Sequence, residues 1–251
     1  MRKWSVIIPT LWRSDRISKL INDLDTTPQI NEIILIDNAP EQAPKTISSP
    51  KMKIISKGEN IFVNPAWNWG IQKAVNEYVV LCNDDIAFDM KIFEELEGAG
   101  LSDAAIGCHF ENFIMEQKPH GQMFLHDGHC IGKGWGCLIF IKKSNYIPIP
   151  SELKIWCGDD WIVHTHNRIY SVMWPIQTEM STSSSLPTLN ALAQKDKEIF
   201  KKSISKRMVR RITLLSTEQY GKFNRMIELH YLIKRLGFAF IRRISIVWKR
   251  N

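Results

Sequence analysis

Short apolar runs alternate with segments of helical periodicity along the first 90 residues. Runs rich in Val, Ile and Leu, a pattern typical of buried strands, occupy residues 6–10, 32–37, 53–56 and 78–82. Apolar positions at helical spacing occupy 14–24, where Ser14 or Asp15 is a candidate N-cap, and 64–77, where Pro65 falls in the first turn. This β-α-β-β-α-β order predicts an α/β fold with a mostly parallel sheet and helices on both faces.

The pattern becomes less regular after residue 90. Short strands are expected at 105–108, 136–141 and 169–174, and helices at 91–97 and 159–166. Residues 111–134 are polar and contain glycine, so they are expected to form a long loop. A Ser/Thr-rich linker at 178–185 precedes two predicted helices, 190–215 and 217–250. We therefore expect a catalytic-type domain over residues 1–188 and a helical extension over 189–251.

Composition supports a folded core and a reducing environment. Of the 251 residues, 44% are hydrophobic, yet no apolar run approaches the roughly 18 residues that a membrane span needs. The five cysteines are odd in number and show no CxxC spacing, and the first predicted strand begins without a signal-peptide pattern. These features indicate free thiols and a cytoplasmic location.

The net charge of +7 is unevenly distributed. Residues 1–194 contain 17 Lys and Arg against 22 Asp and Glu, a net of −5, whereas residues 195–251 contain 16 against 4, a net of +12. The second predicted helix interleaves basic residues with apolar and aromatic ones, which favours a place on the inner face of an anionic membrane. The same helices could instead pack on the acidic body or form a homo-oligomer. Nucleic-acid binding fits less well, because no nucleic-acid motif accompanies the charge.

The strongest candidate for chemistry is Asn83-Asp84-Asp85, which follows the apolar run 78–82 directly. The carboxyl ends of buried parallel strands are where open α/β sheets bind ligands. Carboxylate oxygens suit Mg²⁺ or Mn²⁺, which usually complete their shell with substrate phosphates. The segment therefore indicates a metal-assisted site for a phosphorylated donor, with an ordinary acidic turn as the alternative.

Six segments in order resemble family 2 of the nucleotide-sugar glycosyltransferases, which have the GT-A fold. They are VIIPT (6–10), EIILIDNAP (32–40), NPAWNWGIQKA (64–74), YVVLCNDDIAFD (78–89), GKGWGCLIFIKKS (132–144) and GDDWIVH (158–164). The resemblance covers roughly residues 4–185 and does not extend to the basic tail.

The resemblance implies a donor site built from three segments. Pro9 and Thr10 would lie against the nucleotide, and Asp37 would accept a hydrogen bond from an imide N–H of the base. Asn68 and Gly70 match the Asn-x-Gly on the helix that flanks the donor. For Asp37, a turn or helix-cap role is the alternative.

Asn83-Asp84-Asp85 matches the DxD motif of the family, with Asn in its first position. The resemblance then implies that Asp85 binds the metal, Mn²⁺ or Mg²⁺, while Asn83 and Asp84 face the donor sugar or ribose. Many relatives carry a later His that completes the metal shell, but residues 177–183 contain none. His164, His166 or water would have to replace it.

Gly158-Asp159-Asp160-Trp161 matches the acidic motif that supplies the general base of inverting enzymes. Asp160 would take the proton from the acceptor hydroxyl, and Asp159 would orient the acceptor. Both acids could instead merely favour a helix N-terminus. Acceptor contacts are expected from Trp135, Gly136 and Trp161, although Trp135 could equally be a core residue.

These expectations combine into one function. The chain is expected to be an inverting, metal-dependent glycosyltransferase that moves a sugar from a UDP- or dTDP-type donor to a hydroxyl of a glycan or lipid-linked glycan, in the synthesis of a cell-surface polysaccharide such as O-antigen or capsule. A non-catalytic binding or assembly module with the same fold is the first alternative. A nucleotidyltransferase is the second, and the lack of glycine in residues 9–13 argues against it.

Overall fold

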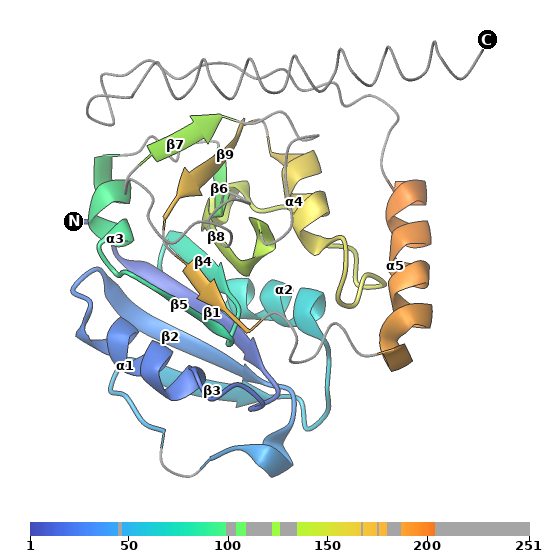
Figure 1. The fold of residues 1–251 in the computed structure, drawn as a ribbon, viewed down its shortest axis with the longest axis horizontal. Helices are drawn as coiled ribbons and strands as arrows, with labels where there is room; N and C mark the ends of the chain where they lie inside the picture. The colour runs from blue at the N-terminus through green and yellow to red at the C-terminus, as the bar shows by residue number, and fades with distance from the viewer. Residues whose placement is uncertain are drawn as a thin grey trace.

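The computed structural model describes residues 1–44, 47–98, 104–108, 122–125, 135–166, 168–174, 176–179 and 187–203. Within them, an eight-stranded sheet has the order β3-β2-β1-β4-β8-β6-β9-β7 (Figure 1). Its strands are β1 (Trp4–Thr10), β2 (Ile30–Asp37), β3 (Met52–Ser56), β4 (Tyr78–Cys82), β6 (Ala104–Cys108), β7 (Gln122–Leu125), β8 (Leu138–Lys142) and β9 (Arg168–Met173).

The sheet is mostly parallel, as the sequence predicts. β3, β2, β1 and β4 pair in parallel, and β9 pairs in parallel with β6. β8 is antiparallel to both β4 and β6, and β7 is antiparallel to β9, so these two strands run against the rest. A separate antiparallel pair joins β5 (Ile86–Phe88) to β10 (Ile176–Thr178).

Helices cover both faces of the sheet. They are α1 (Ile17–Thr26), α2 (Val63–Lys73), α3 (Ile92–Glu95), α4 (Gly158–Thr165) and α5 (Asn190–Ser203), with short 3₁₀ turns at Pro40–Gln42, Leu96–Gly98, Trp135–Cys137, Lys143–Asn145 and Pro187–Leu189. Alternate side chains of β1 point to opposite faces: Val6 and Ile8 enter one core cluster with α1, whereas Ile7 enters the other with α2 and α4. The strand pattern thus produces one core on each face.

An aromatic cluster fills the core on the α1 and α3 side. Trp4 is fully buried and makes edge-on contacts with Phe93 and Phe140, with ring centroids 5.9 and 5.6 Å apart. Arg2 lies over the ring of Tyr78 at the edge of this cluster. Each aromatic–aromatic pair in the cluster stabilises the fold by about 0.5–1.5 kcal/mol beyond the contribution of its buried area.

The structure corrects several expected boundaries. α1 begins at Ile17 after Arg16, without a side-chain cap, so neither Ser14 nor Asp15 is its N-cap. α2 ends at Lys73 because Ala74 is extended. Part of the expected loop 111–134 is strand β7, and the short strands β5 and β10 were not expected.

The expected domain boundary at residue 188 stays a prediction. Helix α5, drawn in orange in Figure 1, begins just after this position, and its Ile199 and Phe200 pack against the core cluster that contains α2 and α4. At least part of the expected extension therefore contacts the body. The first predicted tail helix is confirmed over α5, and the remainder of the tail, including the basic helix expected at 217–250, lies outside the described residues.

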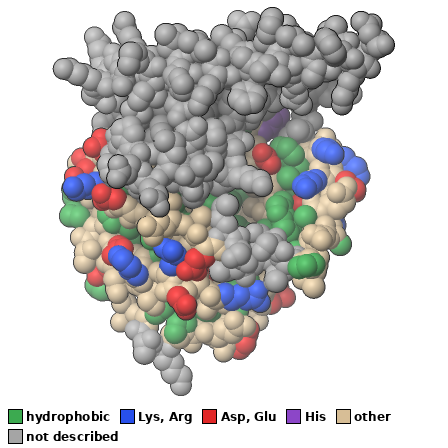
Figure 2. Space-filling model, in the orientation of Figure 1, with side chains coloured by type: hydrophobic (Ala, Val, Ile, Leu, Met, Phe, Trp, Pro, Cys, Tyr) green, Lys and Arg blue, Asp and Glu red, His purple; other side chains and the backbone are tan. Residues whose placement is uncertain are grey.

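The visible surface of the body carries both signs of charge. Figure 2 shows Lys and Arg side chains interspersed with Asp and Glu over the described part of this face. Among the described helices, none has the length and apolar character needed to cross a membrane.

Candidate active site

The parallel register brings the expected donor residues to one edge of the sheet. Pro9 pairs with Ile36, and Thr10 pairs with Asp37, at the carboxyl ends of β1 and β2. β4 lies on the other side of β1, and the turn that follows it carries Asp84. The Thr10 hydroxyl donates a hydrogen bond to Oδ2 of Asp84 at 2.7 Å, so three strand ends meet in one contact network.

Trp12 occupies part of this edge. Its indole Nε1 donates to Oδ1 of Asp37 at 2.8 Å, and its backbone N–H donates to the Thr10 hydroxyl at 2.8 Å. Asp37 is almost fully buried, and the same Oδ1 also accepts the Ala39 N–H at 3.0 Å. Trp12 has a φ of 59°, which is unusual for a bulky residue. The loop after β1 therefore contacts both Asp37 and, through Thr10, Asp84.

Burial perturbs the acidic turn after β4. It raises the pKa of Asp84 from 3.8 to about 6; the Thr10 hydrogen bond opposes this shift and the charge of Asp85 adds to it. Asn83, half-buried in the same turn, donates its backbone N–H to the Cys137 carbonyl at 2.9 Å. This bond ties the acidic turn to the 3₁₀ turn Trp135–Cys137.

Asp85 is buried, with an exposed fraction of 8%. Its Oδ1 lacks a hydrogen bond of normal geometry, while the hydroxyl of Thr178 on β10 lies beside the carboxylate and opposes the rise in its pKa. Burial raises the pKa of Asp85. An unpartnered carboxylate oxygen in a buried site costs free energy, and a bound cation would remove that cost.

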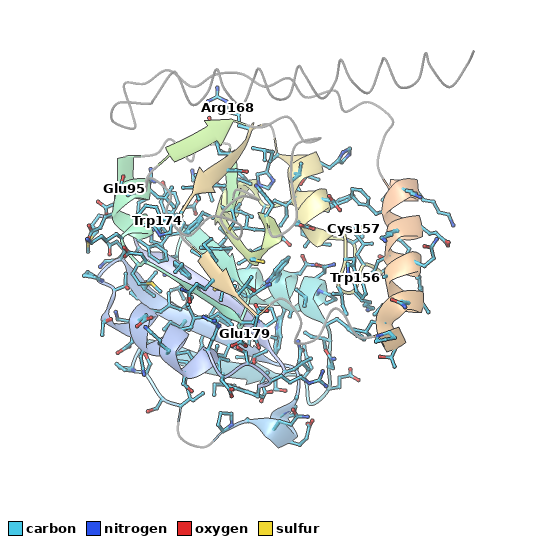
Figure 3. The ribbon with its side chains drawn as sticks, viewed as in Figure 1. Glu95, Trp156, Cys157, Arg168, Trp174 and Glu179 are labelled. Carbon is cyan, nitrogen blue, oxygen red and sulfur yellow. The ribbon has the colours of Figure 1, made fainter. Side chains whose placement is uncertain are left out.

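Glu179, labelled in Figure 3, directly follows β10, and its charge acts on the Asp85 carboxylate. Its backbone N–H donates to the Asp85 carbonyl at 3.2 Å. Its side chain accepts hydrogen bonds from Arg16 Nε and from the Ser14 hydroxyl, both at 3.0 Å. The charge of Glu179 adds to the rise in the pKa of Asp85, whereas that of Arg16 opposes it.

The second acidic pair begins helix α4. A Cβ on Gly136 would lie 2.8 Å from the Asp159 Cβ, so only glycine leaves room for Asp159 there. Burial raises the pKa of the Cys137 thiol to about 12, and the charges of Asp85 and Asp159 add to that rise, so both carboxylates are within electrostatic range of this thiol. Burial raises the pKa of Asp159, and the charge of Asp160 adds to that rise.

Asp160 is more exposed than Asp159 and lies beside the Cys157 thiol, which opposes the burial-driven rise in its pKa. Cys157 has a φ of 62° at the residue before α4. Figure 3 places Cys157 and Trp156 between α4 and α5. Asp159 thus packs on Gly136, whereas Asp160 contacts the Cys157 thiol.

Two expected donor residues have structural contacts of their own. The Asn68 side chain donates to the Ile149 carbonyl at 2.8 Å and accepts from Tyr146 Oη at 2.6 Å and the Ile149 N–H at 3.0 Å. Gly70 packs against β1, because a Cβ there would lie 2.2 Å from Ile7 Cγ2. Both residues hold α2 in place, and their donor contacts stay predictions.

The surroundings of Trp135 favour its alternative as a core residue over the expected acceptor contact. The side chain is fully buried, and its Nε1 donates to the Tyr170 carbonyl at 3.2 Å. Its ring packs on Gly107, where a Cβ would lie 2.2 Å from the ring. Trp161 is half-buried, donates to the Ile147 carbonyl at 3.3 Å and contacts the His164 ring. Its acceptor role stays a prediction.

The metal prediction is supported only at Asp85. Among the described residues, no three His, Cys, Asp or Glu side chains approach closely enough to hold a metal by themselves. His164 lies in the last turn of α4, whereas Asp159 lies in the first, so the helix separates His164 from the carboxylates near Cys137. A cation held by Asp85, water and donor phosphates fits this arrangement.

Three residues of the site were not expected from the sequence: Trp12, Thr178 and Glu179. Only the unusual position of Trp12, directly after the Pro9-Thr10 turn, is a local signal that could have been noticed. The others act through partners that are distant in sequence.

The comparisons with known proteins agree with this geometry. The model of the family described as "Glycosyl transferase family 2" matches residues 5–172, more than half of the chain. The chain belongs to glycosyl transferase family 2. The ends of β1, β2 and β4 and both acidic pairs fall within the family 2 match, whereas β10, Glu179 and α5 fall outside it.

Solved structures share the fold of this family 2 chain. Residues 1–349 of S. aureus TarS match at 15% identity and a TM-score of 0.51, over 68% of this chain and 58% of that one. The same fragment in complex with UDP-GlcNAc matches at 13% identity and a TM-score of 0.51, over 73% and 61%. The chain therefore spans less than two thirds of these structures, and the likeness shows a GT-A fold. No curated protein sequence matches significantly.

Proposed function

We propose that the chain is an inverting, metal-dependent transferase that moves a sugar from a nucleotide-sugar donor to a hydroxyl of a glycan or lipid-linked glycan. The observation that carries the proposal is the buried Asp85, whose Oδ1 has no partner, at the carboxyl edge of a family 2 sheet. Three other acids, Asp37, Asp84 and Asp159, come close to the same edge from different elements.

The donor side of the proposal rests on Asp37 and the Thr10–Asp84 pair. A carboxylate at the end of β2 can accept the imide N–H that uracil and thymine both carry, so UDP- and dTDP-sugars are the donor classes to test. The complex of TarS with UDP-GlcNAc makes UDP-sugars the first choice. Asp84, held by Thr10 at 2.7 Å, would then contact the ribose or the sugar.

The metal side rests on Asp85, which would hold Mn²⁺ or Mg²⁺. Such a cation, when bound, supplies positive charge that stabilises a nucleoside diphosphate leaving group. The unpartnered Asp85 Oδ1 is free for this role, and Glu179 is not, because Arg16 and Ser14 already bind its carboxylate.

The acceptor side rests on the acids that begin α4. We assign the proton-accepting role to Asp160 and the orienting role to Asp159, which packs on Gly136. A carboxylate with a raised pKa is a better proton acceptor than an ordinary one, because its basicity lies closer to neutral pH. Burial raises the pKa of both acids.

Transfer assays test this assignment. The wild type with Mn²⁺, a UDP- or dTDP-sugar and a glycan acceptor should release nucleotide, and Asp160→Asn should lower kcat by about 10²–10⁴-fold. Glu152→Gln, an exposed acid upstream of α4, is the matched control and should leave kcat unchanged. Full activity in Asp160→Asn would exclude it as the base, and a wild type that binds donors without turnover would indicate a non-catalytic binding module.

For location, we propose a cytoplasmic enzyme that binds the inner face of the membrane through its basic tail. The support is the net charge of +12 over residues 195–251, together with the amphipathic pattern of residues 217–250. Deleting residues 217–251 should weaken sedimentation with anionic liposomes while donor hydrolysis persists. Equal liposome binding by the truncated protein would refute the membrane role.

A further inference from the structure

Helix α5 places a buried charge next to the segment that leads into the acidic pair. The Asp196 side chain has an exposed fraction of 0%. Its Oδ1 accepts the backbone N–H of Lys154 at 3.1 Å, and its Oδ2 accepts those of Ile155 at 2.9 Å and Trp156 at 3.0 Å. A buried carboxylate is tolerated when such charge-assisted bonds replace its water, so these three bonds define the position of the segment.

Helix α2 holds the same segment from its other side. Asn64 is fully buried; its backbone N–H donates to the Lys154 carbonyl at 3.0 Å, and its Nδ2 donates to the Trp156 carbonyl at 3.2 Å. Gly158 packs directly on this side chain, because a Cβ there would lie 2.0 Å from Asn64 Oδ1. Residues 154–156 are thus held through their N–H groups by α5 and through two of their carbonyls by α2.

The residue between this segment and α4 has a strained backbone. Cys157 has a φ of 62°, and its carbonyl accepts the Trp161 N–H at 3.0 Å as the first bond of α4. A left-handed conformation at a residue other than glycine costs about 1–3 kcal/mol and persists only where the surroundings impose it. If Asp196 releases the segment, Cys157 can relax to negative φ, which would turn the first residues of α4, including Asp159 and Asp160.

We propose that Asp196 is a positioning residue that fixes the two acids at the start of α4, an inference that rests on the function proposed above. Asp196 lies outside the family match at 5–172, so the site of this chain includes a helix that the family model does not cover. The donor-side acids are held by β1, β2 and β4, and within the described part of the chain no hydrogen bond joins them to residues 154–158. Loss of Asp196 should therefore impair transfer and spare donor binding.

The experiment compares Asp196→Ala and Asp196→Asn with Glu198→Gln in the full chain. Glu198 is exposed two residues along the same helix, and its removal takes away the same charge. Asp196→Ala should lower kcat by about 10²-fold, as expected for misplaced catalytic groups, with the donor KM unchanged. Asp196→Asn keeps one acceptor oxygen, so its kcat should lie between those of Asp196→Ala and the wild type. The kcat of Glu198→Gln should equal that of the wild type.

A second readout does not depend on the reaction. Amide hydrogen exchange over residues 154–161 should accelerate at least about tenfold in Asp196→Ala, while exchange in β1 and β4 stays at the wild-type rate. A retained kcat with unchanged exchange over 157–161 would overturn the proposal. So would a donor KM that rises in step with the fall in kcat, since that indicates general loss of fold. If the wild type transfers no sugar, the proposed function fails, and hydrogen exchange alone decides whether Asp196 positions α4.

Discussion

Trp12 donates its indole N–H to the carboxylate of Asp37, with 2.8 Å between Nε1 and Oδ1. Asp37 is the acid at the end of β2 to which we assign the imide N–H of a donor base. An indole N–H and an imide N–H need the same kind of acceptor, so the side chain of Trp12 competes with the base for this carboxylate.

Trp12→Phe should therefore bind UDP and dTDP more tightly. The phenyl ring keeps an aromatic surface but has no N–H, and a hydrogen bond to a charged group contributes about 1.5–3 kcal/mol, part of which is recovered on donor binding. We expect Kd to fall about fivefold by calorimetry. In an Asp37→Asn background, Trp12→Phe should change Kd much less. An equal change in Kd in both backgrounds would show that Trp12 does not act through Asp37.

Glu32 is a buried carboxylate at the opposite edge of the sheet, with an exposed fraction of 5%. Burial alone would raise its pKa, but hydrogen bonds from Lys53, Ser5 and the Val75 N–H outweigh burial and lower it below 4.5. A pKa lowered by folding means that the carboxylate stabilises the fold above pH 4.5, and that this stabilisation is lost as pH falls through the folded pKa.

Glu32→Gln should accordingly destabilise the protein by about 1–3 kcal/mol at pH 7, because the amide cannot accept the same three bonds. The difference from wild type should shrink as pH falls below 4.5. Urea unfolding at pH 7 and pH 4 measures it. Glu77→Gln is the control: this half-exposed acid lies 3.6 Å from Lys142, and its loss should cost less than about 1 kcal/mol at either pH. If Glu32→Gln lowers the free energy of unfolding by the same amount at both pH values, the lowered pKa of Glu32 in the folded state is contradicted.

The part of the site that the sequence predicts is the part with local signals. Asp37 and Asn83-Asp84-Asp85 directly follow apolar strands, and parallel strands bring their carboxyl ends to one edge. Asp159 and Asp160 precede a short helical pattern. In each case the neighbouring residues suffice to place the side chain at the edge of the sheet.

Where the structure shows a contact that the sequence did not predict, the partner is distant in sequence. Asn68 is engaged by Tyr146 and Ile149, and Trp135 is buried against Gly107. The role of Asp196 could not be predicted from the sequence for the same reason, because its partners precede it by some 40 residues. The strands β5 and β10 have only three residues each, too few for a period to be visible.

Replacing Trp135 distinguishes a role in the core from a role in acceptor binding. Trp135→Ala should lower the free energy of unfolding by about 3–5 kcal/mol, because it removes a fully buried indole that fills the space above Gly107. Trp161→Ala, at a half-buried position, should cost less stability. Chemical denaturation measures both. A stable Trp135→Ala protein with a raised acceptor KM would restore the acceptor role.

The central claim is that Asp85 holds a divalent cation that a nucleotide-sugar shares. The direct measurement is thermal stabilisation by UDP- and dTDP-sugars with Mn²⁺ in wild type, Asp85→Asn and Asp89→Asn, the last an exposed acid in the same segment. Because ligands that bind the folded state raise its stability, wild type and Asp89→Asn should show equal Mn²⁺-dependent increases in Tm, and Asp85→Asn should show none. Equal stabilisation of Asp85→Asn, or no response of the wild type to any of these donors, would contradict the account.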